Sequence, residues 1–437
     1  MSNYDLNRRV FLQGAASAAL LGPLVVLGQD KPAAINIGCI GVGGKGWSDM
    51  HEVSVGHNIV AICDVDEQRL AKAAEKFPKA KKYTSWQKLL EQENIDAVTV
   101  STPDHTHAPA TMSAMQLGKH VYTQKPLTHD VFESRQLTRV AKEKKLITQM
   151  GIQHHATARL KLAVDAIQNN AIGKVSETHV WTDRPGSFWK QGLSRPEKKD
   201  QVPASLHWND WLGTAPERPY VAGLYHSFHW RGWWDFGTGA LGDMGCHLMD
   251  PVIDALELGP PKIITAEGPP PNAESGPEWC IVHYTFPGTK QTTETTQVHW
   301  YEADKQPDRA LFQAPDDWAG SKNGVLFIGE KGNLFVGFPE MPELFPKEKF
   351  SDYKWPEFTD HNHYQEWTTA VATGGKTSCP FEYSGPLTET VLLGNVAYRS
   401  GKTIEWDSTT MTAKGEPSAN QYVKRAYREG WTIPGLS

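Results

Sequence analysis

The sequence predicts an α/β protein in which a doubly wound parallel sheet is followed by a second, α+β domain. Three observations lead to this fold class. The chain has 437 residues, more than a single hydrophobic core usually serves. Short β-branched runs alternate with helical segments up to about residue 153, and a loop-rich stretch with alternating strands follows. We therefore expect one domain over residues 34–153 and another over residues 154–437.

The first domain is expected to contain strands joined by helices. The predicted strands cover residues 35–40, 58–64, 96–102, 120–126 and 147–153. Between them, segments such as DEQRLAKAAEKF and VFESRQLTRVAKEKK carry apolar residues at helical spacing. Strands that alternate with helices form βαβ units, so we expect a parallel sheet with helices on both faces.

The second domain begins with a helix expected at about residues 156–169 and a strand at 175–183. After a loop-rich stretch, residues 279–288 and 292–303 alternate apolar and polar side chains, as antiparallel strands do. Helical segments from about residue 361 onwards are expected to pack back between the domains.

Composition restricts the class of protein. Apolar residues make up 39% of the chain and charged residues 22%, which is typical of a soluble globular enzyme. The net charge is −6 and no long basic run follows the N-terminus, so nucleic acid is not an expected partner, because phosphate binding needs a clustered basic face. The five cysteines are an odd number and do not indicate a disulfide framework.

Residues 1–30 resemble a twin-arginine export signal. Arg8 and Arg9 are followed by a Phe-Leu pair and an apolar run that is interrupted by polar residues and proline. That order of residues is typical of a targeting segment rather than of a permanent membrane span; an ordinary N-terminal helix is the alternative. We expect a periplasmic or otherwise exported protein, which contacts the membrane only through this segment if it is not cleaved.

A glycine-rich turn follows the first predicted strand. Gly41, Gly43 and Gly46 form a G-x-G-x-x-G pattern, in which the glycines allow a tight turn, close approach of a pyrophosphate and close helix packing. We expect Gly44 and Lys45, within the same turn, to contact the cofactor as well.

Asp64 ends the second predicted strand at the distance expected for a ribose-binding carboxylate. It would accept a hydrogen bond from the adenosine ribose 2′-hydroxyl and would repel a 2′-phosphate, so NAD is favoured over NADP. The alternative role for Asp64 is that of a helix N-cap. Together, the glycine turn and Asp64 predict a dinucleotide-binding Rossmann domain.

Three further motifs carry a resemblance to a known family. STPDHTHAP at residues 101–109, TQKPLT at 123–128 and GALGDMGCHLMD at 239–250 resemble the glucose–fructose oxidoreductase, inositol dehydrogenase and rhizopine-catabolism (Gfo/Idh/MocA) family. The resemblance implies a Rossmann domain joined to a C-terminal domain with a large open, mainly antiparallel sheet. It also implies oxidation of sugars or polyols with NAD(P), and a homo-dimer or homo-tetramer assembled through that sheet.

The resemblance also assigns residues to the nicotinamide end of the cofactor site. These residues are Thr102, Pro103, Asp104, His107, Gln124 and Lys125. The family carries Glu where this chain has Gln124, which removes a negative charge beside Lys125. Histidine pairs such as His105 and His107 lack a Cys or carboxylate at familiar ligand spacing, so no metal is expected.

Oxidation of a carbinol needs a base for the hydroxyl proton. Asp243 and His247 are four residues apart, which places both on one face of a helix. We assign His247 as the general base and Asp243 as the residue that orients it, and by resemblance we assign Lys125 as the group that polarises the substrate oxygen. The alternative is that Asp243 caps a helix and His247 is an ordinary buried histidine.

Tryptophan is abundant in the stretch before this motif, and flat aromatic faces stack on sugar rings while Arg and His bind hydroxyl groups. The substrate-pocket candidates are Arg184, Trp189, Tyr225, His226, Trp230 and Arg231. The alternative for each aromatic residue is a place in the core or in a subunit interface.

The export signal and the nucleotide motif together favour a cofactor that never leaves the protein, because free NAD is not expected outside the cytoplasm. The first hypothesis is an NAD-dependent sugar or polyol oxidoreductase that recycles its cofactor. The second is a glycoside hydrolase that works by transient oxidation at C3 and elimination. The third is a non-catalytic sugar-binding protein with structural NAD.

Overall fold

The computed structural model describes residues 33–437. The predicted signal segment, residues 1–30, lies outside this part of the chain. Within it, no helix combines the length and the apolar character that crossing a membrane requires.

The N-terminal sheet is parallel throughout and has the strand order β3-β2-β1-β4-β5-β6. Its strands are β1 (Asn36–Ile40), β2 (Asn58–Cys63), β3 (Lys81–Tyr83), β4 (Ala97–Val100), β5 (His120–Thr123) and β6 (Thr148–Met150). This order confirms the predicted doubly wound fold. The sequence analysis missed β3, because this short edge strand has the sequence KKY and lacks an apolar run; it forms by pairing with β2.

Helices cover both faces of this sheet, as predicted. They are α1 (Lys45–Val53), α2 (Glu67–Lys76), α3 (Trp86–Leu90), α4 (Asp104–Gln116) and α5 (Val131–Lys144). Apolar residues of α1 and α2 share one core with α10 (His363–Thr373), and those of α3, α4 and α5 share the other. An aspartate accepts a hydrogen bond at the start of α2, and another forms a capping box at the start of α5.

The C-terminal sheet has the order β13-β12-β11-β7-β10-β9-β8-β14-β15. Its strands are β7 (Val175–Thr182), β8 (Ile263–Glu267), β9 (Ile281–Pro287), β10 (Thr292–Glu302), β11 (Gly324–Gly329), β12 (Gly332–Gly337), β13 (Glu343–Phe345), β14 (Ile404–Asp407) and β15 (Thr412–Lys414). Strands β7 and β10 run parallel, and the other pairings recorded for these strands are antiparallel. The sheet is therefore mainly antiparallel, as predicted.

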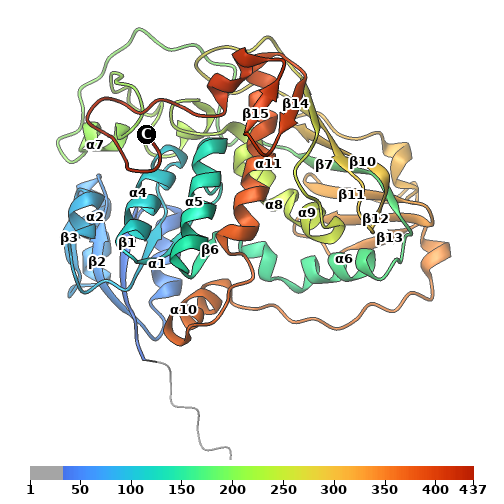
Figure 1. The fold of residues 1–437 in the computed structure, drawn as a ribbon, viewed down its shortest axis with the longest axis horizontal. Helices are drawn as coiled ribbons and strands as arrows, with labels where there is room; N and C mark the ends of the chain where they lie inside the picture. The colour runs from blue at the N-terminus through green and yellow to red at the C-terminus, as the bar shows by residue number, and fades with distance from the viewer. Residues whose placement is uncertain (1–32) are drawn as a thin grey trace, which may run out of the picture. The chain divides into compact units, whose positions relative to one another are not determined.

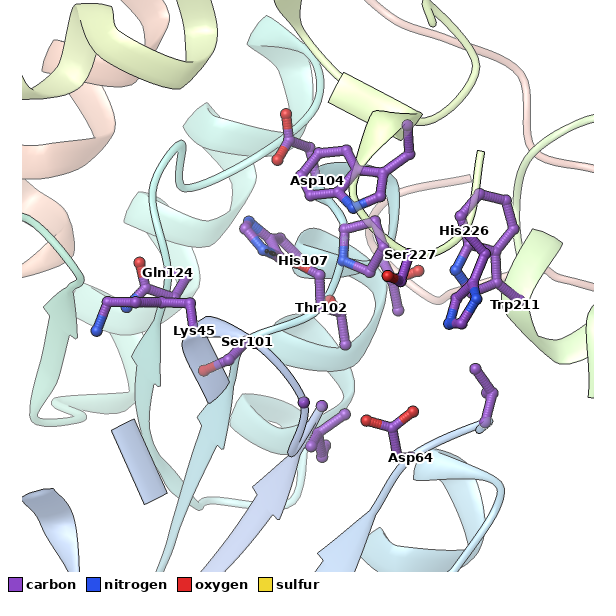
Figure 2. Close-up of a pocket in the computed structure, with 18 of the residues that line it drawn as sticks. Lys45, Asp64, Ser101, Thr102, Asp104, His107, Gln124, Trp211, His226 and Ser227 are labelled. Atoms are coloured by element: carbon purple, nitrogen blue, oxygen red, sulfur yellow. Dashed lines mark hydrogen bonds between the residues drawn. The ribbon is translucent and has the colours of Figure 1, made fainter. Parts of the chain in front are cut away.

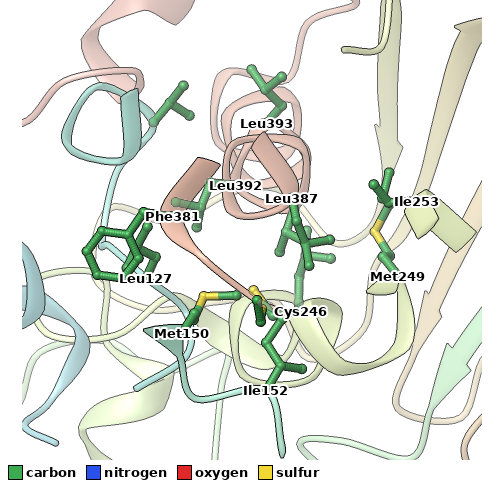
Figure 3. Close-up of a cluster of buried hydrophobic side chains, with 14 of the residues drawn as sticks. Leu127, Met150, Ile152, Cys246, Met249, Ile253, Phe381, Leu387, Leu392 and Leu393 are labelled. Carbon is green, nitrogen blue, oxygen red and sulfur yellow. The ribbon is translucent and has the colours of Figure 1, made fainter. Parts of the chain in front are cut away.

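One long helix joins the two sheets into a single compact body. Helix α11 (Phe381–Ser400) packs against α5 of the first domain and against α8 (Gly239–Leu248) of the second (Figure 1). Figure 3 shows Leu387 of α11 near Met150 of β6 and Cys246 of α8. Helices α6 (Ala158–Gln168) and α9 (Asp250–Leu256) complete the layer that covers the second sheet. This shared core fixes the position of one domain relative to the other.

The aromatic stretch between β7 and α8 docks on the first domain. We call residues 205–231 the cover segment; it contains α7 (Trp208–Leu212). Leu206 forms an antiparallel bridge with Asp66, and the His207 amide donates to the Val65 carbonyl at 2.9 Å. The cover segment therefore pairs with the loop that follows β2, the strand that ends at the predicted ribose site.

The core of the second sheet contains a buried carboxyl group. Glu302, 1% exposed, accepts a hydrogen bond from the Trp300 indole N–H at 3.1 Å. Burial raises the pKa of Glu302 from 4.5 to about 8, and the Trp300 bond lowers it only in part. The folded state therefore binds this proton more tightly than the unfolded state does. Its contribution to stability is present below about pH 4.5 and is lost as the pH rises through about 8.

Replacing Glu302 with Gln should flatten this dependence. A neutral amide oxygen still accepts from Trp300 but carries no charge to bury. We expect the Glu302→Gln protein to be more stable than the wild type at pH 9, with the difference shrinking towards pH 5, in urea unfolding followed by circular dichroism. The matched control is Glu405→Gln, at an exposed glutamate of β14, which should leave the pH dependence unchanged. A parallel pH profile in the Glu302→Gln protein would contradict the raised pKa.

Candidate active site

A cavity of about 540 Å³ opens at the carboxyl ends of the strands of the parallel sheet. Ligands bind at this edge in open α/β folds. The glycine turn, Asp64 and the ends of β4 and β5 form one side of the cavity, and the cover segment and Asp243 of α8 form the other. Figure 2 shows Thr102 between Gln124 on one side and His226 on the other.

The glycine turn has the geometry that its spacing predicts. Gly41 has a φ of +78°, and a Cβ atom there would lie 2.6 Å from the Ser101 carbonyl oxygen. A Cβ atom on Gly46 would lie 1.9 Å from the Gly41 carbonyl oxygen. Helix α1 therefore begins in direct contact with the turn, and its Gly46 and Trp47 amides donate to the Gly43 and Gly44 carbonyls. Gly43, Gly44 and Lys45 line the cavity wall.

Asp64 lies at the end of β2 with both carboxylate oxygens held by the backbone. Oδ2 accepts from the Val42 amide and Oδ1 from the Asp66 amide, each at 3.0 Å. Burial raises the pKa of Asp64, and these amides with Arg69 oppose the shift. Helix α2 is capped by Asp66 and not by Asp64, so the alternative role of Asp64 as a helix cap is wrong.

The end of β4 is fixed by two buried polar side chains. His107 places its two ring nitrogens 2.8 Å from the Thr102 carbonyl oxygen and 2.7 Å from the Pro126 carbonyl oxygen, so it ties the ends of β4 and β5 together. Asp104 accepts from the Thr238 hydroxyl at 2.7 Å. Burial raises the pKa of Asp104, while His107 and other neighbours oppose that shift. Thr102, Pro103, Asp104 and His107 all line the cavity.

Lys125 and Asp243 meet across the domain boundary. The Lys125 ammonium donates to Asp243 Oδ1 at 2.9 Å and also to the Asp243 carbonyl oxygen. Arg231 donates to the same Oδ1 atom at 3.1 Å. Burial raises the pKa of Asp243, but the two cations outweigh it and hold the pKa well below its ordinary value. An ionised carboxylate with two cations therefore lies at one end of the cavity.

His247 is not oriented by Asp243, and that part of the prediction is wrong. The recorded partners of the Asp243 carboxylate are Lys125 and Arg231, because two cations compete better for it than a neutral imidazole does. Within residues 33–437, His247 Nδ1 is buried without a hydrogen-bond partner, and the ring contacts His154 edge-on. Burial and the Lys125 charge hold the pKa of His247 well below 6.5. The imidazole is neutral at pH 7, beside the cavity rather than in its wall.

The substrate candidates divide into two groups. His226, Trp230 and Arg231 line the cavity. Trp189 and Tyr225 are wrong as pocket residues, because they are 2% and 1% exposed and absent from the cavity wall. Tyr225 packs into the aromatic core of the loop-rich stretch, and Trp189 lies against the Phe228 ring.

Arg184 is also absent from the cavity wall. Its guanidinium lies 3.1 Å from the centre of the Phe188 ring. Three of the six candidates line the cavity, and the sequence shows no period in this stretch that would separate inward from outward side chains.

Comparison with protein-family models identifies both domains. Residues 35–152 match the model described as "Oxidoreductase family, NAD-binding Rossmann fold". Residues 167–297 match its companion, "Oxidoreductase family, C-terminal alpha/beta domain". The chain belongs to the Gfo/Idh/MocA oxidoreductase family.

Curated relatives resemble this chain over part of their length. A levoglucosan dehydrogenase from Pseudarthrobacter phenanthrenivorans is 27% identical over 189 residues, covering 43% of this chain and 40% of the relative. An alpha-N-acetylgalactosaminidase from Shewanella oneidensis is 30% identical over 167 residues, covering 31% of this chain and 36% of the relative. The chain thus matches less than half the length of each.

Solved structures of the fold resemble the chain more completely. The WlbA dehydrogenase from Bordetella pertussis, in complex with NADH and UDP-GlcNAcA, has a TM-score of 0.61 at 16% sequence identity, covering 86% of this chain and 99% of that one. At this identity the likeness establishes the two-domain fold.

The geometry of the cavity fits the dinucleotide of the Gfo/Idh/MocA family. The glycine turn is open at Gly44, where a Cβ atom would meet nothing within 4 Å, and Asp64 lines the cavity at the position expected for the ribose. The Thr102 hydroxyl is buried without a partner among the described residues. The residues that would hold NAD are therefore those of the turn, Asp64 and the ends of β4 and β5.

The sequence analysis missed the wall that the cover segment contributes. Asp210, Trp211, Ser227 and Phe228 line the cavity opposite the glycine turn. No motif marks them, because their position depends on the pairing of Leu206 with the loop after β2. The sequence signal that could have found Trp211 and Phe228 was the aromatic stretch itself, but only some of its aromatic residues were chosen as candidates.

Substituting Gly46 with Ala should disrupt the cofactor site. The added methyl group would overlap the Gly41 carbonyl, so we expect a loss of about 1–3 kcal/mol of unfolding free energy, as in other overpacked sites. NAD binding measured by equilibrium dialysis should fall below detection. The control is Gly259→Ala, where a Cβ atom meets nothing within 4 Å. Normal NAD binding by the Gly46→Ala protein would show that the turn does not hold the cofactor.

Proposed function

We propose that this protein is an NAD-dependent oxidoreductase that acts on a secondary hydroxyl group of a sugar, glycoside or polyol and keeps its cofactor tightly bound. The observation that carries the proposal is that Lys125 and Asp243 line the same cavity as the glycine turn and Asp64. Membership of the oxidoreductase family and the similarity to a levoglucosan dehydrogenase support a carbohydrate substrate.

The proposed roles follow from the charges at this end of the cavity. When bound, NAD supplies the group that accepts the hydride of the carbinol carbon. Lys125, held by Asp243, is placed to donate a hydrogen bond to the substrate oxygen and to stabilise negative charge on it. His247 stays the proposed general base because its imidazole is neutral; since it lies beside the cavity and not in its wall, the proposal requires that substrate binding bring the hydroxyl group within reach of the ring.

The proposed substrate wall is rigid and aromatic. The Arg231 guanidinium lies between the Phe228 and Trp230 rings, 4.3 and 4.4 Å from their centres. Its Nε atom is bound to Asp243 and its Nη1 atom to the Phe228 carbonyl. Arg231 can therefore present its remaining N–H groups to substrate hydroxyls while its plane stays fixed.

The cover segment supports the proposal of a retained cofactor. Trp211 and His226 face the cavity opposite Asp64, so they would overlie the adenosine end. Arg428 near the C-terminus fastens α7 from outside: its guanidinium donates to the Asn209 side chain and carbonyl and to the Gly213 carbonyl, each at 3.0 Å. A bound dinucleotide would leave only after this wall opens.

Charge favours NAD over NADP in this proposal. Asp64 and Asp210 of the cover segment line the cavity, and Asp66 lies two residues after Asp64. These groups would repel a 2′-phosphate. Arg69 opposes them in part, but its nearest recorded carboxylate is Asp66, at 3.6 Å.

The expectations for the whole protein complete the proposal. The segment at residues 1–30 supports export by the twin-arginine route, with the chain folded around NAD beforehand, and anchorage if the segment is retained. A homo-dimer or homo-tetramer remains our proposal on the family resemblance.

A second candidate function is NAD-dependent glycoside cleavage by transient oxidation at C3 and elimination. The match to an alpha-N-acetylgalactosaminidase favours it. The same residues serve both reactions, because elimination also needs a base, to remove the C2 proton once the neighbouring carbon is a ketone. Non-catalytic sugar binding is the third candidate; it would leave Lys125 and Asp243 without a chemical role.

A glycoside panel separates these candidates. The purified protein is mixed with sugars, polyols and aryl glycosides while absorbance at the reduced-nicotinamide band and aglycone release are followed. Oxidoreduction predicts a reduced band that persists until an acceptor is added, whereas cleavage predicts free aglycone without a net band. His247→Ala should lower turnover about 100- to 10,000-fold, as expected for a general base, with NAD binding retained. Unchanged turnover would remove His247 from the mechanism.

Loosening the cover should release the cofactor. Arg428→Ala removes three charge-assisted hydrogen bonds from α7, and we expect NAD to dissociate about tenfold faster, a shift of about 1.4 kcal/mol. The rate is followed by rapid gel filtration and assay of the nucleotide left on the protein. Glu217→Ala, an exposed partner 3.8 Å from Arg428, is the control and should not change the rate. An unchanged rate in Arg428→Ala would show that the clamp does not retain NAD.

A further inference from the structure

One buried carboxylate holds three of the side chains that form the cavity wall. Asp49 of α1 is fully buried and does not itself line the cavity. Its Oδ2 atom accepts from the Ser101 hydroxyl and from Gln124 Nε2, both at 2.8 Å. Its Oδ1 atom accepts from the Tyr364 hydroxyl at 2.8 Å and pairs with the Lys45 ammonium. Ser101, Gln124 and Lys45 all line the cavity.

Through its two carboxylate oxygens, Asp49 connects four parts of the fold. Lys45 begins α1, Ser101 follows β4, Gln124 follows β5 and Tyr364 belongs to α10. The elements come from both ends of the chain, so the carboxylate fixes their relative positions where the cofactor binds. Burial and Asp49 raise the pKa of Tyr364, which keeps its hydroxyl protonated as a donor to Asp49.

We propose that Asp49 is a cofactor-positioning residue whose partner is Gln124, and that the pair replaces the glutamate expected before Lys125. The amide nitrogen of Gln124 is committed to Asp49, which leaves the amide oxygen as the atom available to a donor in the cavity. A carboxylate at position 124 would instead stand 2.8 Å from a second carboxylate. In this chain the negative charge lies on Asp49 and not at residue 124, and Gln124 relays its orienting effect.

The surroundings of Gln124 hold its side chain against Asp49. Its backbone amide donates to the Val100 carbonyl at 2.9 Å, which fixes the start of the side chain. A Cβ atom on Gly151 would lie 2.7 Å from the amide group. Gly151 thus provides the space in which the amide lies against Asp49, and a rotated side chain would lose the charge-assisted bond.

A charge-exchange experiment tests the pair. The full-length variants are Gln124→Glu, Asp49→Asn, the double variant, and the control Gln87→Glu, which adds the same charge at an exposed site on α3. NAD dissociation constants are measured by equilibrium dialysis from pH 6 to 9, and folding is checked by circular dichroism. The readout is cofactor binding, which needs no substrate, so its outcome is separate from that of the proposed function.

The proposal predicts a specific pattern of rescue. Gln124→Glu should weaken NAD binding about tenfold at pH 8, because two carboxylates then face each other, and binding should recover towards pH 6 as they share a proton. The double variant should regain affinity to within about threefold of the wild type and lose that pH dependence, since the new amide at position 49 donates to the new carboxylate. The control should match the wild type.

Two outcomes would overturn the proposal. One is a Gln124→Glu protein that binds NAD like the wild type at every pH. The other is a double variant whose loss equals the product of the two single losses, because a merely structural role for Asp49 gives independent defects. If Gln124→Glu alone does not fold, recovery of folding and NAD binding in the double variant supports the pair, and failure to recover contradicts it.

Discussion

The ion pair between Lys125 and Asp243 is the interaction on which the active site depends. Lys125 follows β5 of the parallel sheet, and Asp243 lies on α8 of the second domain. Both side chains are 15% exposed, so removing either partner would leave a poorly solvated charge. The pair forms only if the two domains keep their register, and α11 maintains it by packing Leu387 and its neighbours against both (Figure 3). The apolar core therefore positions the two domains so that the Lys125–Asp243 ion pair can form.

Lys125 and Arg231 both bind Asp243, which explains why helical spacing wrongly predicted His247 as its partner. An i,i+4 pair lies on one helix face, and that is all the spacing determines. Lys125 and Arg231 arrive from distant segments and take the carboxylate because a cation gains more from it than a neutral ring does. His247 is left against His154 with its pKa held well below 6.5. A carboxylate hydrogen-bond partner would raise that pKa; without one, the imidazole is neutral at pH 7.

The sequence predicted correctly those features that depend on residues close together in the chain. The glycine turn, the place of Asp64 at the end of β2 and the alternation of strands and helices depend on residues close in the chain, and the structure contains them. Strand β3 was missed because an edge strand of two lysines and a tyrosine exists only through its pairing with β2. Trp189 and Tyr225 were placed in the pocket because composition does not show which side of an irregular loop a ring occupies. Asp49 was missed because its partners come from four separate elements.

The buried aromatic rings of the loop-rich stretch stabilise the cavity wall. A long irregular stretch that forms a cavity wall needs a core to hold it, since loops that lack buried contacts are mobile. Tyr225 of the cover segment packs with Trp233 and Phe236, and Trp211, whose ring also lines the cavity, packs against Phe236. His226, Trp230 and Arg231 are then held towards the cavity by neighbours in the chain that point away from it. Aromatic side chains of this stretch therefore have two roles: some form the buried core, and others line the cavity. The buried core holds the stretch in place, and Arg231 can then bind Asp243.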